Sequence, residues 1–262
     1  MPAMSKRSML KMSLALGRRA LFSPAQAARE ARKEENLRPA LYLYSAFLLG
    51  YMLFFWIKPA NFPDTGAALP GESQSLLFWL KVMIWQPPLE AAWILFLMGF
   101  IVWFRSGGLP LRLAAATAWT ALPFILMAAY VQKGGIPKWA FGAAATAAFA
   151  LFYPLLRKAP ARDLKPVITF MLSINVIGLV LLAPMSAVVL IGHSGFFNFS
   201  QIVGGLWILG VGTLGLRELT GLRLPRAFMS LLFSMFFQVA FAFTLHLLGL
   251  VPKEILKALL YA

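Results

Sequence analysis

Long apolar segments alternate with short polar ones along most of the chain. A helix needs about 20 apolar residues to cross the hydrocarbon core of a bilayer, and Pro, Gly and charged residues between such segments favour breaks. The candidate spans are residues 40–58, 88–104, 110–131, 137–156, 166–191, 197–216 and 226–250. The pattern therefore predicts an all-α fold, a polytopic transmembrane helical bundle of about seven spans within a range of five to seven.

The composition supports a membrane environment. Of the 262 residues, 60% are hydrophobic and 13% are charged, whereas soluble domains are roughly half apolar and a quarter charged. The chain has 24 Lys and Arg against nine Asp and Glu, and such an excess indicates either nucleic acid or an anionic membrane surface as a partner. Because no nucleic-acid-binding motif is present, we expect anionic lipid and no nucleic acid.

The basic residues also predict the orientation of the spans, because short cytoplasmic loops are enriched in Lys and Arg. With seven spans, eighteen of the 24 basic residues fall on one side, in the N-terminal segment and in the connections 105–112, 157–165 and 217–226. The other side receives six. The N-terminus is therefore predicted to lie inside, in the cytoplasm, and the C-terminus to lie outside.

Residues 1–39 form a basic arm, and residues 40–262 form the transmembrane domain. Between Met9 and Phe22, apolar and basic residues alternate in a way that can give a helix one apolar and one basic side on the membrane surface. A flexible basic tail is the alternative, because the apolar side is short and Gly17 interrupts it. The candidate contacts with anionic lipid are Lys6, Arg7, Lys11, Arg18 and Arg19.

A second helix of the arm has clearer boundary signals. Ser23 can cap it, Pro24 suits its first position, and Gln26 completes a capping box. Pro39 disfavours a helical conformation in the residue before it. We expect this helix to begin after Ser23 and to end before Pro39.

The longest connection, residues 59–87, is predicted to lie outside. Residues 76–85 (LLFWLKVMIW) are apolar but too short to cross the bilayer, and they include Lys81. They are expected to form a separate interfacial helix with tryptophans at headgroup level. Residues 61–74, which are rich in Pro, Gly and Asp, are expected to form a loop.

Polar side chains at membrane depth are costly and therefore mark candidate sites. Glu90 follows Gln86-Pro-Pro at the predicted start of the second span, where the helix dipole and free backbone N–H groups favour a carboxylate. Asn175 lies in the fifth span, and Gln238 and His246 lie on nearly one face of the last span. Single hydrogen bonds between helices are the more usual role of such residues. The alternative is that these four line a shared cavity as an ion, proton or substrate site.

No catalytic, metal or cofactor site is predicted. The chain has no Cys and two His, and no acidic residue lies at ligand spacing from either His. Gly-x-Ser-x-Gly elbows, Walker loops and paired catalytic carboxylates are missing. The Gly-rich stretch 204–215 superficially resembles a phosphate loop, but it lies in a span and better suits close helix packing. We expect a protein that is not an enzyme and that binds no cofactor.

Several short phrases resemble the bacterial branch of the Yip family, the Ypt-interacting-protein-like membrane proteins. They are FSPAQAAR at 22–29, RSGGLPLR at 105–112, AWTALP at 118–123, and the segment from Trp207 through the turn LRELTGLRLPRA at 216–227. The resemblance covers about residues 20–250, and it consists of loop phrases and not of catalytic signatures.

The resemblance implies a multi-pass protein of the bacterial cytoplasmic (inner) membrane with commonly five spans, so that seven would mean an added pair, best placed within 137–191. It also implies a non-enzymatic membrane-shaping or assembly role, with lipids and with other membrane proteins or a second copy of the chain as partners. The Asp-Leu-Tyr-Gly-Pro phrase of eukaryotic members is missing, so their vesicle-traffic role and small-GTPase partners are not expected. The alternative function is a transporter or a permease subunit of a larger membrane complex.

Overall fold

The computed structural model of the chain describes residues 6–58, 62, 76–252 and 256. This part of the chain is helical and contains no strand. Seven of its helical segments are long and apolar enough to cross a membrane: Glu34–Ile57, Val82–Arg105, Leu109–Gln132, Lys138–Arg157, Ala161–Ile191, Ser194–Thr220 and Leu224–Leu247. The predicted all-α, seven-span architecture is thereby confirmed, and the chain is a multi-pass integral membrane protein.

Two helices precede the spans, α1 (Lys6–Phe22) and α2 (Pro24–Ala31). A 3₁₀ turn, Glu34–Asn36, leads into the first span, α3 (Leu37–Ile57). The others are α4 (Leu76–Arg105), α5 (Leu109–Lys133), α6 (Lys138–Ala150) with α7 (Tyr153–Arg157), α8 (Ala161–Ile174) with α9 (Val176–Ile191), α10 (Ser194–Thr220) and α11 (Leu224–Leu247). The fourth and fifth spans are thus each built from two helices.

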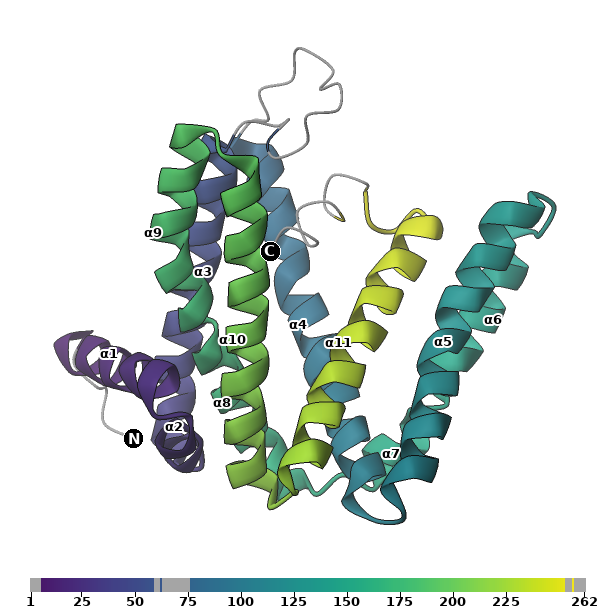
Figure 1. Cartoon of the computed structure of the whole chain (residues 1–262), viewed down its shortest axis with the longest axis horizontal. Helices are drawn as coiled ribbons and strands as arrows, with labels where there is room; N and C mark the ends of the chain where they lie inside the picture. Colours follow the sequence, from purple (N-terminus) through teal and green to yellow (C-terminus); the bar gives the residue numbers. More distant parts are fainter. Residues whose placement is uncertain (1–5, 59–61, 63–75, 253–255, 257–262) are drawn as a thin grey trace.

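Successive spans run in opposite directions (Figure 1). The turns after α4, α7 and α10 lie at the same end of the bundle as α2, and we call this the arm end. The turns after α5 and α9 lie at the opposite end, which we call the far end. The basic segments that the charge pattern placed on one side are therefore together at the arm end. That this end faces the cytoplasm stays a prediction, and most of the expected loop at 61–74 lies outside the described residues.

The second span is longer than predicted, because residues 76–85 continue directly into it. α4 runs through Pro87 and Pro88 without interruption, so the expected separate interfacial helix is wrong. The added turns have an apolar partner surface: Trp79 stacks on Phe55 of α3 with ring centroids 5.0 Å apart. Tertiary packing supplies most of the stability of helices in proteins. Here the stability gained from packing exceeds the cost of the two intrahelical hydrogen bonds that the prolines cannot donate.

The second helix of the arm is shorter than predicted. α2 ends at Ala31, and Pro39 lies in the first turn of α3 instead of stopping a helix. Proline is tolerated there because the first N–H groups of a helix have no intrahelical partner. Ser23 is the N-cap residue of α2 and Pro24 follows it, as predicted, but the Ser23 side chain makes no capping hydrogen bond.

The fifth span is interrupted at a polar residue. α8 ends at Ile174, α9 begins at Val176, and Asn175 lies between them as the cap residue of both helices. α9 then continues through Pro184 to its end. The break therefore places an amide side chain inside the bundle.

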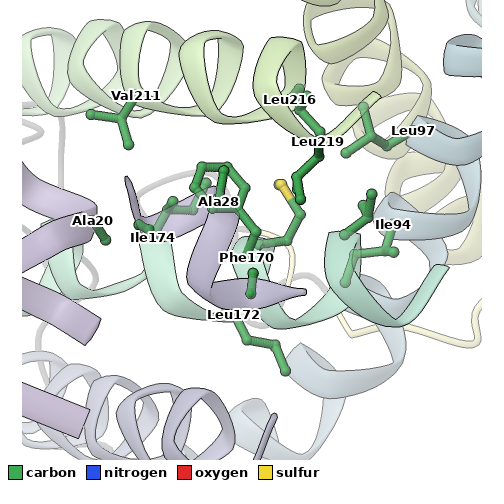
Figure 2. Packing of buried hydrophobic residues seen from close by; sticks show 14 of the residues in the cluster. Ala20, Ala28, Ile94, Leu97, Phe170, Leu172, Ile174, Val211, Leu216 and Leu219 are labelled. Atoms are coloured by element: carbon green, nitrogen blue, oxygen red, sulfur yellow. The ribbon is translucent and has the colours of Figure 1, made fainter. Parts of the chain in front are cut away.

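The largest hydrophobic core joins the arm to the spans. Figure 2 shows Ala20 of α1 and Ala28 of α2 in one cluster with Phe170 and Ile174 of α8 and with Leu216 of α10. Because these alanines share a core cluster with residues of the spans, α1 and α2 are packed on the bundle. Their small side chains allow the helices to approach closely. Of the two alternatives for the first part of the arm, the structure shows the helix.

Within the Gly-rich stretch 204–215, Gly204, Gly212 and Gly215 allow close helix packing, as predicted. A Cβ atom added to Gly215 would lie 1.9 Å from the Cζ atom of Phe170. One added to Gly212 would lie 2.6 Å from a methyl group of Leu231 in α11. α10 can therefore approach α8 and α11 this closely because glycine has no side chain at these two positions.

Candidate functional site

α1 lies across the bundle near the arm end (Figure 1), in contact with α3, α8 and α9. Ser13, Leu16, Gly17 and Ala20 are buried on the side that faces the spans. The Ser13 hydroxyl group lies 3.3 Å from the carbonyl oxygen of Pro39 in α3. One side of α1 is therefore fixed to the transmembrane domain.

The outer side of α1 carries a basic stripe beside an apolar one. Arg7, Lys11 and Arg18 are exposed, and their spacing of four and seven residues places them along one line of the helix. Leu10 and Leu14 are 45% and 62% exposed on the adjacent line. A helix with one side on protein, one apolar side and one basic side suits the membrane interface, where protein, lipid tails and headgroups meet.

The other two predicted lipid contacts differ from these three. The side chain of Lys6 lies outside the described part of the chain. Arg19 pairs with Glu30 of α2 at 3.4 Å, and Lys33 donates a hydrogen bond to Glu30 at 3.0 Å. That hydrogen bond, aided by the charges of Lys33 and Arg19, lowers the pKa of Glu30 below its ordinary value. Arg19 thus joins α1 to α2.

Two arginines attach α2 to the last turn of α10. Arg29 donates from Nε to Oε1 of Glu218 at 2.8 Å. Arg32 donates to the carbonyl oxygens of Glu218 and Leu219 at 3.1 and 3.0 Å. The last carbonyl groups of a helix lack intrahelical partners, so Arg32 supplies donors that α10 itself does not provide.

A hollow of about 560 Å³ opens at the arm end where α2, α4, α8 and α10 meet. Its charged lining residues are Arg32, Arg105, Arg162, Asp163 and Glu218. Arg105 and Asp163 form an ion pair at 3.1 Å, and Glu218 is paired with α2 as described above. The positive groups of the hollow are therefore largely engaged with protein atoms already.

Glu90 lies in the middle of α4 and not at a helix N-terminus. Its side chain is 8% exposed, and Oε1 has no hydrogen-bond partner among the described residues. The expectation that a helix N-terminus stabilises this carboxylate is wrong, because α4 begins at Leu76 and because Pro87 and Pro88 carry no N–H group. The carboxyl group depends on neighbouring helices for polar contacts.

Two polar side chains from other elements lie near this carboxyl group. Asn175, at the break between α8 and α9, lies near Glu90, and its Nδ2 atom donates to the carbonyl oxygen of Met171 at 3.2 Å. Tyr44 of α3 lies within electrostatic range of Glu90. The Tyr44 side chain is 6% exposed, and its hydroxyl group has no hydrogen-bond partner in the described structure.

Gln238 and His246 both bond to backbone carbonyl groups. Gln238 donates from Nε2 to the carbonyl oxygen of Leu89 at 3.4 Å. His246 has Nδ1 2.8 Å from the carbonyl oxygen of Val251, in the turn that follows α11. Of the four predicted intramembrane residues, the structure therefore places Asn175 near Glu90, bonds Gln238 to the backbone of the residue that precedes Glu90, and engages His246 with a backbone group beyond α11.

Tyr44 is the residue of this site that the sequence did not reveal. A tyrosine within an apolar span resembles any other core aromatic residue, and only burial makes its hydroxyl group conspicuous, because a buried tyrosine usually has a hydrogen-bond partner. Its proximity to Glu90 depends on the packing of α3 against α4, which spacing along the chain does not encode.

Neither a metal-binding cluster nor a known relative adds to this description of the site. In the part of the chain that the structure describes, no group of His, Asp and Glu residues could hold a metal ion. Comparisons of the chain with protein-family models, with curated proteins and with solved structures found no match.

Proposed function

We propose that this integral membrane protein is a non-enzymatic organiser of the membrane, of the type that its Yip-like loop phrases suggest, and that its basic arm binds anionic lipid on the cytoplasmic side of the bacterial inner membrane. The observation that carries the proposal is the exposed basic stripe of α1. Arg7, Lys11 and Arg18 lie beside exposed leucines on a helix whose opposite side is fixed to the spans.

Two features determine the strength of such binding: the number of basic residues at the lipid surface, and the fact that α1 is already folded before lipid binds. Each Lys or Arg near an anionic leaflet contributes about 1 kcal/mol, and salt weakens the attraction. α1 is already folded and packed on the bundle, so that binding does not have to order the helix as well. Three basic residues on a fixed helix therefore favour anionic headgroups beside the first and fifth spans.

Attachment of the arm to the bundle is what would make lipid binding organise the membrane. α1 contacts α3, α8 and α9, and α2 is joined to α10 through Arg29 and Arg32. Lipids held by α1 would thus keep a fixed position relative to the spans. A patch of defined lipid next to apolar helices is a suitable docking surface for other membrane proteins or for a second copy of this chain.

The test uses the full-length protein in bilayer nanodiscs that contain phosphatidylcholine and a minor share of phosphatidylglycerol. After gentle extraction, mass spectrometry measures which lipids remain bound. The arm variant carries Arg7→Gln, Lys11→Gln and Arg18→Gln. A control variant with the same loss of charge carries Arg157→Gln, Lys158→Gln and Arg223→Gln, which are exposed residues of the arm end outside the arm.

We expect the wild-type protein and the control variant to retain phosphatidylglycerol preferentially at low salt, and the arm variant to lose most of that preference. High salt should reduce the preference of the wild-type protein towards that of the arm variant. Equal retention of phosphatidylglycerol by the arm and control variants would show that α1 is not a lipid-binding element, and the proposed role would then lose its basis.

The transporter or permease alternative receives less support. It requires Glu90, Asn175, Gln238 and His246 to face one water-accessible cavity. Gln238 and His246 are bonded to backbone carbonyl groups in separate places, and the hollow of about 560 Å³ at the arm end is lined by none of the four residues.

A further inference from the structure

The carboxyl group of Glu90 has no counter-charge in the described structure. The ion pairs there join residues of the arm and of the arm-end turns, and none includes Glu90. Transfer of an isolated carboxylate into an apolar interior is so unfavourable that such a group either pairs with a cation or takes up a proton. Within a span, lipid excludes water further.

The elements packed against α4 bring to the region of Glu90 groups that are polar but uncharged at neutral pH. α3 brings the hydroxyl group of Tyr44, and the α8–α9 break brings the amide of Asn175. α11 brings Gln238, which is bonded to Leu89, and Ser234, whose hydroxyl group accepts a hydrogen bond from the indole of Trp93 at 3.0 Å.

The described charged groups of these neighbouring helices belong to their terminal turns. On α3, α5, α7 and α8 these are the arm-end residues Arg38, Arg112, Arg157, Arg162, Asp163 and Lys165. On α11 they are Arg226 in the first turn and the titratable His246 in the last. Among the described residues, Tyr44 is therefore the buried titratable group of these helices that lies within electrostatic range of Glu90.

We infer that Glu90, Tyr44 and Asn175 form a proton-binding site in the interior of the bundle, with the proton carried by the carboxyl group of Glu90. The proton adds to a carboxylate oxygen, one O–H bond forms and no bond breaks. The product is a neutral acid that has an O–H donor in addition to its carbonyl oxygen. This assignment removes the uncompensated charge of a carboxyl group whose Oε1 atom is buried without a hydrogen-bond partner among the described residues.

The site goes beyond lipid binding by the arm, because it lies on α3, α4 and the broken fifth span and uses no residue of the basic stripe. Asn175 links it to the break, since the same amide group that neighbours Glu90 also bonds the carbonyl oxygen of Met171 in α8. A proton that enters or leaves Glu90 therefore changes the charge next to the one interruption of this span.

The first measurement uses dicyclohexylcarbodiimide, an apolar reagent for protonated carboxylic acids. The acid proton moves to a nitrogen of the reagent, the carboxyl oxygen bonds to its central carbon, and rearrangement gives a stable N-acylurea that retains all atoms of both reactants. The full-length protein is treated in phosphatidylcholine vesicles across a pH series, and peptide mass spectrometry locates the adduct. Glu90→Gln removes the acid with little change in shape, and Glu35→Gln, at an exposed residue of the arm, is the matched control.

We expect the adduct on Glu90 in the wild-type protein and in Glu35→Gln, less of it as the pH rises, and none at this position in Glu90→Gln. Protection of Glu90 by sodium ions at constant pH would show instead a site for a monovalent metal cation, and it would overturn the assignment to a proton.

A second measurement decides the case in which the reagent does not reach the buried site. The infrared difference spectrum between the wild-type protein and Glu90→Gln at neutral pH should contain the C=O band of a protonated carboxylic acid, and this band should shift when H₂O is replaced by D₂O. A difference spectrum with only carboxylate bands would show that Glu90 is ionised in the folded protein, and the inference would be wrong.

Discussion

At the scale of single residues, the ring of Phe170 occupies the space in which a side chain at Gly215 would begin. We predict that Gly215→Ala lowers the free energy of unfolding by about 1–3 kcal/mol, the usual cost of an overpacked core, because the added Cβ would lie 1.9 Å from the ring. The measurement is the temperature at which the protein, heated in mild detergent, ceases to be monodisperse. The double variant Gly215→Ala with Phe170→Leu should recover part of the loss.

Gly210 of the same helix provides the control for this contact. A Cβ atom added there would meet no heavy atom within 4 Å, and alanine is the better helix former by roughly 1 kcal/mol. Gly210→Ala should therefore be neutral or mildly stabilising. Equal destabilisation by the two substitutions would mean that α10 does not approach α8 as closely as the structure has it.

For single residues, the sequence predicted the role of a side chain better than the residues that it contacts. The Gly-rich stretch 204–215 indicated close packing, and Glu90 and Asn175 were marked by their polarity in apolar segments. The partner of Gly215 and the neighbours of Glu90 could not be predicted, because each contact joins helices that are far apart along the chain. Physical reasoning from polarity finds a buried group, whereas tertiary packing decides what lies beside it.

At the scale of elements, α2 depends on Arg32 for its attachment to α10. Arg32→Gln removes a charged donor to the carbonyl groups of Glu218 and Leu219, and because the side chain is exposed we expect a loss of only about 1 kcal/mol. Hydrogen exchange in α2 should become faster, while exchange in α4 should stay unchanged. Arg157→Gln, which removes the same charge from α7, should leave α2 as protected as in the wild-type protein.

Acid should weaken the same element through Glu30. The pKa of Glu30 is lowered in the folded chain by Lys33 and Arg19, so these interactions stabilise the fold above the ordinary carboxyl pKa of about 4.3. That stability is lost as the pH falls through the lowered value of the folded state. At pH 7, Glu30→Gln should lower the free energy of unfolding by less than about 1 kcal/mol. The resulting small difference in unfolding temperature between the two proteins should vanish in acid.

The elements themselves followed from hydropathy where they are long and failed where local signals compete with packing. All seven spans were predicted from apolar length. Pro39 and the pair at 87–88 were interpreted as boundaries, yet the structure has helix at both places, because the first turn of α3 does not need the Pro39 N–H and because Trp79 packs on α3. Asn175 interrupts the fifth span although nothing near it is a strong helix breaker.

At the scale of the whole molecule, the arrangement of the spans makes a sharp prediction about sidedness. The turn after α4 and the arm lie at one end of the bundle, and the turn after α5 lies at the other (Figure 1). Because the chain has no cysteine, a single introduced thiol reports its position without background. Gly108 in the first turn has open space around it, and Gly135 in the second is exposed.

We predict that a membrane-impermeant thiol reagent applied to intact bacterial spheroplasts labels Gly135→Cys and not Gly108→Cys, and that both react after the membrane is opened. This outcome follows because the basic residues gather at the arm end, which the charge distribution assigns to the cytoplasm. Labelling of Gly108→Cys alone in intact spheroplasts would show that the protein has the opposite orientation in the membrane, with α1 away from the cytoplasmic leaflet. Labelling of both in intact spheroplasts would mean that α5 does not cross the membrane, in conflict with the seven-span arrangement.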